Sequence, residues 1–377
     1  MALKNKFEIG NNMKSKKITF YFSSMAKGGS QRVIVNLAES LLNKGHQVTI
    51  VTTMIAENEY ELPKGVKRIL SDISEEEITS NRLLNLKKRF CKLRNIWKEE
   101  QPDIIISFIG KNNFMAILTA WGLKIPVVVS VRAEPTVEYY NSFMRFCAKH
   151  LLCKADGIVL QTEDSKAFFN KKTLKKAVVL PNPLNPNFIG DYYEGIRENK
   201  IVAVGRIDSL KNQKLIVESF FKIAAELADV ELVLYGDGED RESLMELAKR
   251  SPYADRISFP GSVNNVKEHI KRAKLFVLSS NAEGMPNALM EALALGIPCV
   301  STNCPCGGPK MLMEGKENGI LVPVGDSEEM AKAMKTILQD EELWEKYSKN
   351  AYDITKDLNP TVVNKKWQEY LYSIMDK

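Results

Sequence analysis

Two glutamates, Glu283 and Glu291, flank a turn that could hold an anionic ligand. A β-rich apolar run precedes Glu283, and the sequence that opens at Pro286-Asn287 is typical of a helix start. Gly284 would let backbone approach a ligand, and the amides at the positive end of a helix dipole attract anions. A diphosphate would fit such a site, with Glu283 before the helix and Glu291 about a turn and a half inside it.

A second segment that could do chemistry, Gly205-Arg206-Ile-Asp-Ser-Leu-Lys211, follows another β-rich run. Negative charge develops on a phosphate as it leaves a substrate, and fixed cations such as Arg206 and Lys211 would stabilise that charge without reorganisation. An ordinary surface helix start is the alternative interpretation. The turn Gly236-Asp237-Gly238 follows the next predicted strand and is, as a motif, little more than a turn.

Paired glycines, Gly28 and Gly29, separate the first predicted strand from the first predicted helix. Glycines at such a position let main chain come close to a phosphate or a sugar. The G-x-G-x-x-G spacing of a dinucleotide-binding fold is absent, and no acidic residue caps the next strand at Thr52-Thr53. A nicotinamide-dependent dehydrogenase is therefore disfavoured.

Potential metal ligands are scattered along the sequence. The histidines follow no ligand spacing, and Cys304-Pro305-Cys306 lacks partner ligands, so it is interpreted as an ordinary loop. The six cysteines do not suggest a disulfide scaffold. We expect neither a metal nor a cofactor.

The elements that must position these residues alternate between short β-rich runs and helical stretches, which is typical of parallel sheets covered by helices. A length of 377 residues fits two domains. A helix is predicted over residues 31–43, ended by Gly45. Predicted strands cover residues 18–22, 48–52, 104–108, 127–131, 157–160, 201–204, 231–235, 257–259, 275–279 and 299–301.

Three prolines among residues 181–186 exclude a helix or a central strand there, so this stretch is interpreted as a linker. The prediction is an α/β chain with two doubly wound, Rossmann-like domains that face each other across a ligand-binding cleft. Its predicted parts are a flexible extension, a first domain, the linker, a second domain and a final helix that crosses back to the first domain. They cover residues 1–16, 17–180, 181–186, 187–358 and 359–377.

The net charge of +6 is unevenly divided. Residues 1–180 carry 29 Lys and Arg against 17 Asp and Glu, or +12, and the remaining residues carry −6. The basic half could face membrane lipid, nucleic acid or a pyrophosphate ligand. No apolar run is long enough to span a bilayer and the start lacks the apolar core of a signal peptide, so we expect a cytoplasmic location.

Within the basic half, residues 82–98 are predicted to form an amphipathic helix. Its apolar residues recur at three- and four-residue steps: Leu83, Leu86, Phe90, Leu93 and Trp97. Because cations surround this stripe, the helix could lie on an anionic membrane. The other interpretation is that the stripe packs on the first sheet while the lysines face water.

The segment around Glu283 resembles the family-four retaining glycosyltransferases of GT-B fold, whose signature is Glu, seven residues, Glu. Here it is Glu283-Gly-Met-Pro-Asn-Ala-Leu-Met-Glu291. The resemblance implies that Glu283 contacts the donor sugar and Glu291 the ribose hydroxyls. It also implies that four residues lie near the diphosphate or sugar: Gly284, Met285, Pro286 and Asn287.

The same resemblance implies that Arg206 and Lys211 stabilise the leaving phosphate, so that they act with Glu283 in catalysis. Many relatives carry a histidine after the fourth strand, where this chain has Arg132. Arg132, together with Arg32, is therefore expected on the acceptor side, an ordinary surface arginine being the alternative. Further donor-binding positions implied by the family are Gly28, Gly29, Gly205, Gly236 and Val263.

The resemblance thus implies a metal-independent, retaining transferase that moves a hexose or N-acetylhexosamine from a UDP-sugar to a glycan acceptor in cell-surface polysaccharide or oligosaccharide assembly. Its expected partners are a lipid-diphosphate-linked acceptor and an anionic membrane, without nucleic acid. We expect it on the cytoplasmic face of the membrane as a peripheral protein. The alternatives are a catalytically silent sugar-nucleotide or membrane-binding subunit, or another GT-B enzyme such as a sugar-nucleotide epimerase or a phosphorylase.

Overall fold

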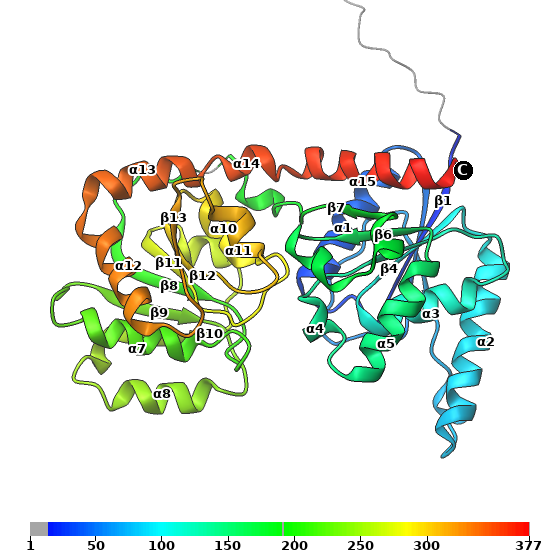
Figure 1. Cartoon of the computed structure of the whole chain (residues 1–377), viewed down its shortest axis with the longest axis horizontal. Helices are drawn as coiled ribbons and strands as arrows, with labels where there is room; N and C mark the ends of the chain where they lie inside the picture. The colour runs from blue at the N-terminus through cyan, green and yellow to red at the C-terminus, as the bar shows by residue number, and fades with distance from the viewer. Residues whose placement is uncertain (1–13, 191, 377) are drawn as a thin grey trace, which may run out of the picture. The chain divides into compact units, whose positions relative to one another are not determined.

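The computed structural model describes residues 14–190 and 192–376 and contains two parallel β-sheets covered by helices (Figure 1). Of the predicted flexible extension, residues 1–13 lie outside the described residues. The chain forms two compact units, one of residues 14–107 and 115–127 and the other of residues 108–114 and 128–376. The predicted α/β class with two doubly wound sheets is confirmed.

Seven strands form the first sheet, in the order β3-β2-β1-β4-β5-β6-β7. All five residues of β4 (Ile104–Phe108) are buried, as expected for a strand that is covered on both faces. Helix α1 (Gly29–Leu42) buries one stripe of apolar residues at helical spacing, including Val33, Leu37 and Leu41. The other strands are β1 (Lys17–Phe22), β2 (Gln47–Thr52), β3 (Lys67–Leu70), β5 (Val127–Ser130), β6 (Gly157–Leu160) and β7 (Ala177–Val179).

The helices of this first half are mostly short after α3. They are α2 (Arg82–Glu100), α3 (Gly110–Ala120), α4 (Pro135–Glu138), α5 (Ser142–Leu151) and α6 (Lys171–Leu174). The apolar stripe of α2 is buried at one end of the helix and exposed at the other. Leu93 and Trp97 are buried, and Trp97 donates a hydrogen bond to Thr119 at 2.8 Å, whereas Leu83 is 78% exposed and Leu86 52%. The stripe therefore packs at one end of α2 and faces outward at the other.

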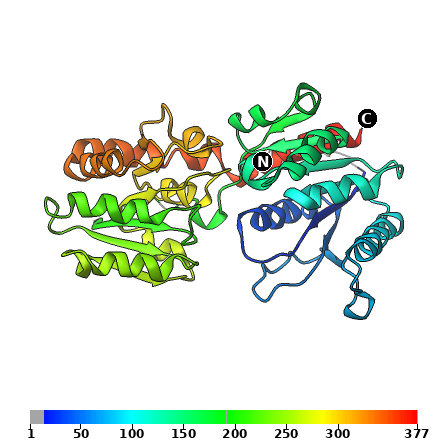
Figure 2. The same cartoon turned by 60° about the horizontal axis from the view of Figure 1, so that its bottom comes forward.

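Six strands form the second sheet, in the order β10-β9-β8-β11-β12-β13. Figures 1 and 2 show the helices in layers on its two faces, and each layer has its own apolar core. One face is covered by α7 (Gln213–Ile223), α8 (Arg241–Lys249) and α12 (Ser327–Gln339), and the other by α10 (Asn287–Ala294), α11 (Gly308–Met313) and α14 (Ile354–Asp357). The strands are β8 (Glu198–Val204), β9 (Glu231–Tyr235), β10 (Ile257–Gly261), β11 (Ala273–Leu278), β12 (Cys299–Thr302) and β13 (Gly319–Val322).

The strand order of the second sheet reverses between β8 and β11, which pair with each other in parallel. The helix after β8 covers one face and the helix after β11 covers the other. Such a topological switch point leaves a crevice at the carboxyl ends of the two strands, where doubly wound folds bind their ligands. The loops that follow β8 and β11 are therefore placed where a ligand is expected.

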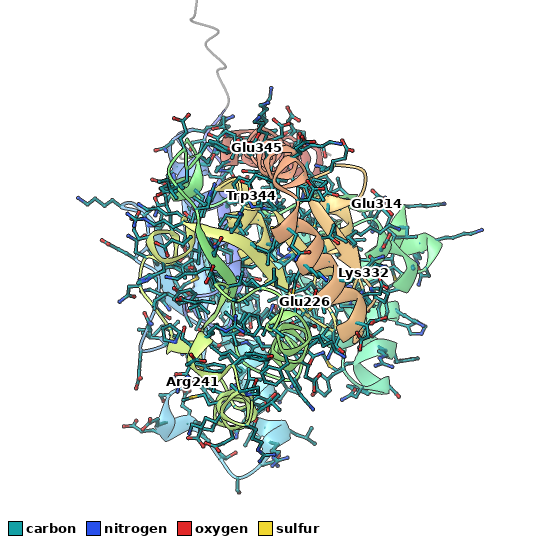
Figure 3. The ribbon with its side chains drawn as sticks, turned by 90° about the vertical axis from the view of Figure 1, so that its left-hand side faces the viewer. Glu226, Arg241, Glu314, Lys332, Trp344 and Glu345 are labelled. Atoms are coloured by element: carbon teal, nitrogen blue, oxygen red, sulfur yellow. The ribbon has the colours of Figure 1, made fainter. Side chains whose placement is uncertain are left out.

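The layer of α7, α12 and α13 (Glu341–Ala351) is held mainly by apolar packing. Figure 3 shows this side, with Glu226 and Trp344 labelled. Glu226 pairs with Lys335 of α12, and Trp344 of α13 donates a hydrogen bond to the carbonyl of Lys274 at 2.7 Å. Exposed ion pairs add little stability. The buried Met334 and Ile337 side chains of α12, in the same core as Phe220 of α7, contribute more.

The predicted linker is a buried segment. Pro181, Asn182, Pro183 and Leu184 are all buried, and the Leu184 amide donates to the carbonyl of Leu358 at 2.8 Å. No helix or strand forms before the short 3₁₀ turn at Pro186–Phe188, as the prolines predict. Its side chains are therefore in a position to contact neighbouring elements.

The last helix, α15 (Pro360–Met375), packs against strands of the first sheet that belong to the same compact unit. Trp367 is fully buried and stacks on Phe108 with a centroid separation of 6.0 Å. The Tyr370 hydroxyl accepts a hydrogen bond from the Ile158 amide at 2.9 Å and donates one to the Lys176 carbonyl at 2.7 Å. Aromatic side chains thus attach α15 to Phe108, to β6 and to the residue before β7.

Replacing Trp367 by alanine should lower the free energy of unfolding by about 3–5 kcal/mol, because it removes a large, fully buried aromatic side chain. The matched control on the same helix is Val362→Ala, since Val362 is 41% exposed. Chemical unfolding followed by circular dichroism measures both. A loss below about 1 kcal/mol for Trp367→Ala would contradict this packing role.

Candidate active site

The loops after β8 and β11 are joined by hydrogen bonds at the switch point. The Asn281 amide donates to the Leu210 carbonyl at 2.8 Å, and its side chain donates to the Ser209 carbonyl at 2.9 Å. The Ser279 hydroxyl donates to the Lys211 carbonyl at 2.8 Å. Two segments some seventy residues apart in sequence are thereby held as one surface.

An ion pair between Lys211 and Glu283 lies within this surface. Lys211 Nζ is 2.5 Å from Glu283 Oε1, and the side chains are only 24% and 10% exposed. The Ser280 hydroxyl donates to the same carboxylate oxygen at 2.7 Å. The Glu283 backbone is fixed as well, because its amide donates to the Pro305 carbonyl at 2.6 Å and its carbonyl accepts from the Cys306 amide at 2.9 Å.

Arg206 is held at the rim of the same loop. Its Nη2 lies 3.1 Å from Asp208 Oδ2, and the arginine side chain is 73% exposed whereas that of Asp208 is 12% exposed. The other oxygen of Asp208 accepts from the Lys211 amide at 2.9 Å. One aspartate therefore shapes the turn that carries both predicted cations, a role that sequence reasoning missed although Asp208 lies within the quoted motif.

Helix α10 begins one residue later than a start at Pro286 would give: Pro286 is the residue before the helix and Asn287 the first helical residue. No side chain caps this end, so the helix leaves its first-turn amides to other acceptors, which suits an anion. Gly284, Met285 and Pro286 are buried and Asn287 is half-buried. Glu291, inside the helix, is 7% exposed.

The glycines after β8 and β9 serve close packing between neighbouring loops. The Gly205 amide donates to the Tyr235 carbonyl at 3.0 Å, and the Gly236 amide donates to the Gly261 carbonyl at 2.9 Å. A β-carbon on Gly236, whose φ is +139°, would lie 1.8 Å from the Gly205 oxygen. Val263 follows two residues after β10 and is half-buried. These residues are thus placed at the carboxyl edge of the second sheet.

Three of the predicted residues, Gly28, Gly29 and Arg32, belong to the other compact unit. Gly28 has an extended conformation and immediately precedes α1, which begins at Gly29. Arg32 lies in the first turn of that helix, and its amide donates to the Gly28 carbonyl at 3.1 Å. The predicted glycine turn between β1 and α1 is therefore present.

Arg132 is 7% exposed, so the interpretation of an ordinary surface arginine is wrong. It follows β5, its guanidinium lies 5.5 Å from the Phe108 ring centroid, and its Nη2 donates to Asn182 of the linker. Burial lowers the Arg132 pKa from its ordinary value to about 9, with Glu138 acting in the opposite sense. Asn182 is a further residue that sequence reasoning missed, because it was interpreted only as part of a linker.

In the Cys304-Pro305-Cys306 segment both cysteines are buried and Pro305 is exposed, and the Pro305 carbonyl and the Cys306 amide support Glu283. Burial raises the pKa of Cys304 to about 12 and that of Cys306 to about 11, so both stay protonated thiols at neutral pH. Within residues 14–190 and 192–376 there is no group of three His, Cys, Asp or Glu arranged to hold a metal ion. In the same part of the chain no helix has the length and apolar character needed to cross a bilayer.

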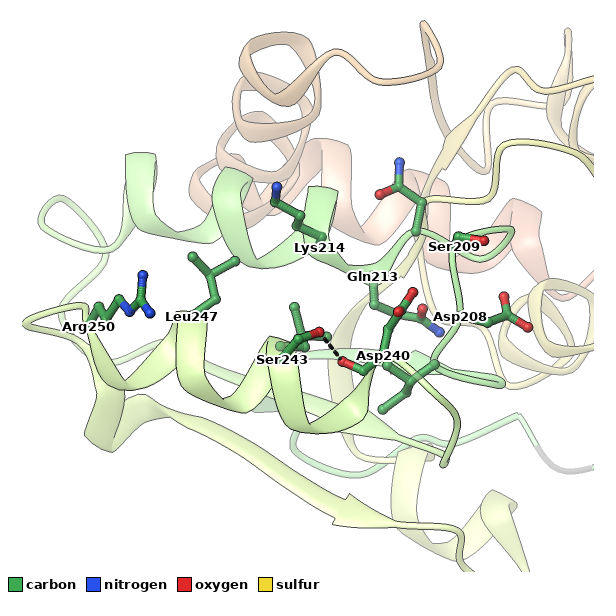
Figure 4. Close-up of a pocket in the computed structure, with 11 residues that line it drawn as sticks. Asp208, Ser209, Gln213, Lys214, Asp240, Ser243, Leu247 and Arg250 are labelled. Carbon is green, nitrogen blue, oxygen red and sulfur yellow. Dashed lines mark hydrogen bonds between the residues drawn. The ribbon is translucent and has the colours of Figure 1, made fainter.

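A separate groove of about 460 Å³ lies beside the switch point, between α7 and α8 (Figure 4). Its lining includes Asp208, Gln213, Asp240 and Leu247. The Ser243 hydroxyl, also in the lining, donates a hydrogen bond to the Asp240 carbonyl at 2.8 Å. Of the residues predicted to act in catalysis or donor binding, this groove contains none. It adjoins the surface that holds Lys211 and Glu283, because Asp208 and Ser209 belong to both.

Comparisons with known proteins agree with this geometry. The family model described as "Glycosyltransferase Family 4" matches residues 27–188, and the one described as "Glycosyl transferases group 1" matches residues 194–354. The lipopolysaccharide core biosynthesis glycosyltransferase LpsE of Rhizobium meliloti is 31% identical over 87% of this chain and 90% of its own length.

A second relative, from Campylobacter jejuni, is 26% identical over 95% of this chain and 99% of its own length. It is named GalNAc-alpha-(1->4)-GalNAc-alpha-(1->3)-diNAcBac-PP-undecaprenol alpha-1,4-N-acetyl-D-galactosaminyltransferase. Among solved structures, HepE of Anabaena in complex with UDP and glucose matches with a TM-score of 0.80 at 17% identity, over 95% of this chain and 100% of that one.

The two doubly wound sheets and the likeness to HepE show a GT-B fold. The chain belongs to glycosyltransferase family 4, because the two family models together match both halves of it and LpsE is a full-length relative. It is accordingly an enzyme of the glycosyltransferase class, and the roles of its individual residues remain predictions.

Replacing Lys211 or Arg206 by alanine should reduce turnover about a hundredfold or more, because each cation would stabilise charge on the leaving group. The matched control is Lys214→Ala, since Lys214 lies three residues away with a side chain that is 66% exposed and pairs with Glu218. Initial rates of transfer, with melting temperatures to verify folding, measure the effect. Folded variants of Lys211 and Arg206 with near-normal turnover would show that neither residue assists departure of the leaving group.

Proposed function

We propose that this chain is a retaining, metal-independent glycosyltransferase that moves a hexose or N-acetylhexosamine from a UDP-sugar to a glycan acceptor. The observation that carries the proposal is the ion pair between Lys211 and Glu283, with a separation of 2.5 Å. Glu283 lies four residues before Asn287, the uncapped start of α10. A cation, a fixed carboxylate and a helix start thus lie in the loops that follow β8 and β11, where a sugar diphosphate would need them.

Each group has a chemical task in this proposal. Arg206 and Lys211 take up the negative charge that develops on the departing UDP, and the first turn of α10 binds the diphosphate. Glu283, oriented by Lys211 and Ser280, contacts the sugar ring, and Glu291 contacts the ribose. The choice of UDP is supported by the related structure of HepE, which was solved with UDP-glucose.

Retention of configuration is what the resemblance implies, and the proposal assigns no side chain as general base, because the Glu283 carboxylate is engaged by Lys211 and Ser280. The leaving phosphate can itself accept the acceptor proton on the face from which it departs. An α-linked product, such as the names of the Campylobacter relatives state for those enzymes, is what retention gives with an α-linked donor. Independence of metal is proposed because Arg206, Lys211 and the helix start already supply positive charge.

The anomeric configuration of the product and the effect of a chelator test the reaction together. A suitable UDP-sugar is first identified by its thermal stabilisation of the protein. NMR of the product formed from this donor should show the anomeric configuration of the donor. The rate of transfer in excess EDTA should stay within about twofold of the rate without it. An inverted product would contradict retention. Activity lost in EDTA and restored by magnesium or manganese would contradict the metal-free mechanism.

We further propose a lipid-diphosphate-linked acceptor, with the enzyme acting as a peripheral protein on the cytoplasmic face of an anionic membrane. Two relatives are named for undecaprenol-linked substrates, and the net charge of +12 on residues 1–180 complements an anionic surface. The exposed start of α2 supplies both apolar and basic side chains, because Leu83 and Leu86 stand beside Lys87.

Changing Leu83 and Leu86 to serine and Lys87 to glutamine should weaken binding to vesicles rich in anionic lipid, because this exposed end would insert apolar groups and attract headgroups. Arg89 and Lys92 are left unchanged, since both contact Asp72 within the fold. Ile196→Ser is the control, because Ile196 is a 92% exposed apolar residue outside α2. If the unaltered protein does not sediment with such vesicles even at low salt, a soluble glycan acceptor is the better proposal.

A further inference from the structure

The side chain of Asn182 connects the buried linker to the loop that precedes α10. Its Oδ1 accepts from Gln161 Nε2 at 2.9 Å and from Arg132 Nη2. Its Nδ2 donates to Asn287 Oδ1 at 3.1 Å and makes a longer contact of 3.4 Å with the Met285 carbonyl. Both ends of one buried amide are thus in use, and it stands between a cation and the first residue of α10.

Arg132 forms this contact from a buried position without an ion pair in the described part of the chain. The neighbouring Glu138 carboxylate accepts instead from the backbone amides of Gly110, Arg132 and Ala133, at 2.8, 2.9 and 3.1 Å. Arg132 Nε and Gln161 Oε1 are buried without a hydrogen-bond partner among the described residues. The guanidinium also makes a longer contact from Nη1 to the Ser130 hydroxyl at 3.4 Å, and the shorter of its two side-chain hydrogen bonds is the one from Nη2 to Asn182.

The loop before α10 lies against the same groups, which limits how it can move. A β-carbon on Gly284 would lie 2.3 Å from Gln161 Oε1 and 2.4 Å from the Arg132 carbonyl oxygen. The backbone amide of Asn182 also donates to Met285 Sδ at 3.2 Å. Backbone and side-chain atoms of residues 132, 161 and 182 thus pack against residues 284–287.

We propose that Asn182 is a positioning residue that relays the charge of Arg132 to Asn287 and so strengthens the diphosphate site at the start of α10. Each hydrogen bond in the chain Arg132, Asn182, Asn287 polarises the next, and charge-assisted bonds are stronger than neutral ones. With its Oδ1 occupied by Asn182, Asn287 keeps its amide NH₂ group for an anionic acceptor. The inference rests on the UDP-sugar donor proposed above, and it makes Arg132 a remote support of the donor site.

The proposal is tested by comparing affinities for UDP and for uridine, which lacks the diphosphate. In Asn182→Asp the nearly isosteric carboxylate still accepts from Arg132 and Gln161, but it cannot donate to Asn287, and it neutralises the guanidinium. We expect UDP affinity to fall at least tenfold while uridine affinity changes less than twofold. Calorimetry measures UDP, and ligand-observed NMR measures uridine.

A second variant, Asn287→Ala, interrupts the relay at its half-buried end and leaves the buried cluster intact. This variant should lower UDP affinity about as much as Asn182→Asp does. Because the two residues act in series, the UDP affinity of the double variant should be at most about threefold lower than that of either single variant. The control is Asn185→Ala in the same linker, whose side chain accepts from the nearby Asn187 amide at 3.1 Å. It should bind UDP like the unaltered chain.

Three results would overturn the relay while leaving the donor assignment intact: unchanged UDP affinity in Asn182→Asp, an equal loss of uridine affinity, or fully additive losses in the double variant. The second result would show general loosening of the fold, which a merely structural linker predicts. Failure of the unaltered protein to bind UDP at all would instead overturn the UDP donor and the relay together.

Discussion

The ion pair between Lys211 and Glu283 is the interaction on which the candidate site depends. Two charges with little solvent exposure are stable there because each compensates the other. In addition, the Ser280 hydroxyl donates to the Glu283 carboxylate, and the backbone of the 303–306 loop forms hydrogen bonds with the Glu283 backbone. Removing one partner would leave a poorly solvated charge. The pair therefore fixes two loops from distant parts of the sequence and at the same time keeps a cation and a carboxylate ready for a ligand.

The topology of the second sheet explains why the pair is possible. Strands β8 and β11 are neighbours, so the loops that follow them emerge side by side, and their helices leave toward opposite faces. Glycines at 205 and 236 allow the adjacent loops to approach each other closely. The buried linker then brings Asn182 to the base of the α10 start, so that packing, backbone geometry and charge serve the same few residues.

Much of this arrangement follows from sequence pattern, because strands buried on both faces appear as continuous apolar runs. The runs at residues 104–108 and 231–235 match β4 and β9 at both ends. Strand β3, with sequence KRIL, escaped prediction because an edge strand needs no apolar run, and β7 has only three residues. Strand β13 was also missed, since a glycine opens its four residues.

The candidate site was predictable as motifs, whereas its contacts were not. Arg206, Lys211, Glu283 and Glu291 stand out by residue type and spacing, but the bond from Lys211 to Glu283 spans 72 positions and appears only in the folded chain. Arg132 was singled out by its position, but nothing local indicated that it and Asn182 are buried: an arginine after a strand usually faces solvent, and an asparagine between prolines is typical of a turn. Their burial depends on long-range packing, which single-sequence patterns do not encode.

A crystal structure of the protein with UDP tests the central claim most directly, because it shows where the diphosphate binds. The account predicts phosphate oxygens within about 3 Å of Lys211 Nζ and of the first-turn amides of α10, with Arg206 turned toward the same group. UDP bound instead in the groove between α7 and α8, or bound with its diphosphate away from both Lys211 and the start of α10, would contradict it.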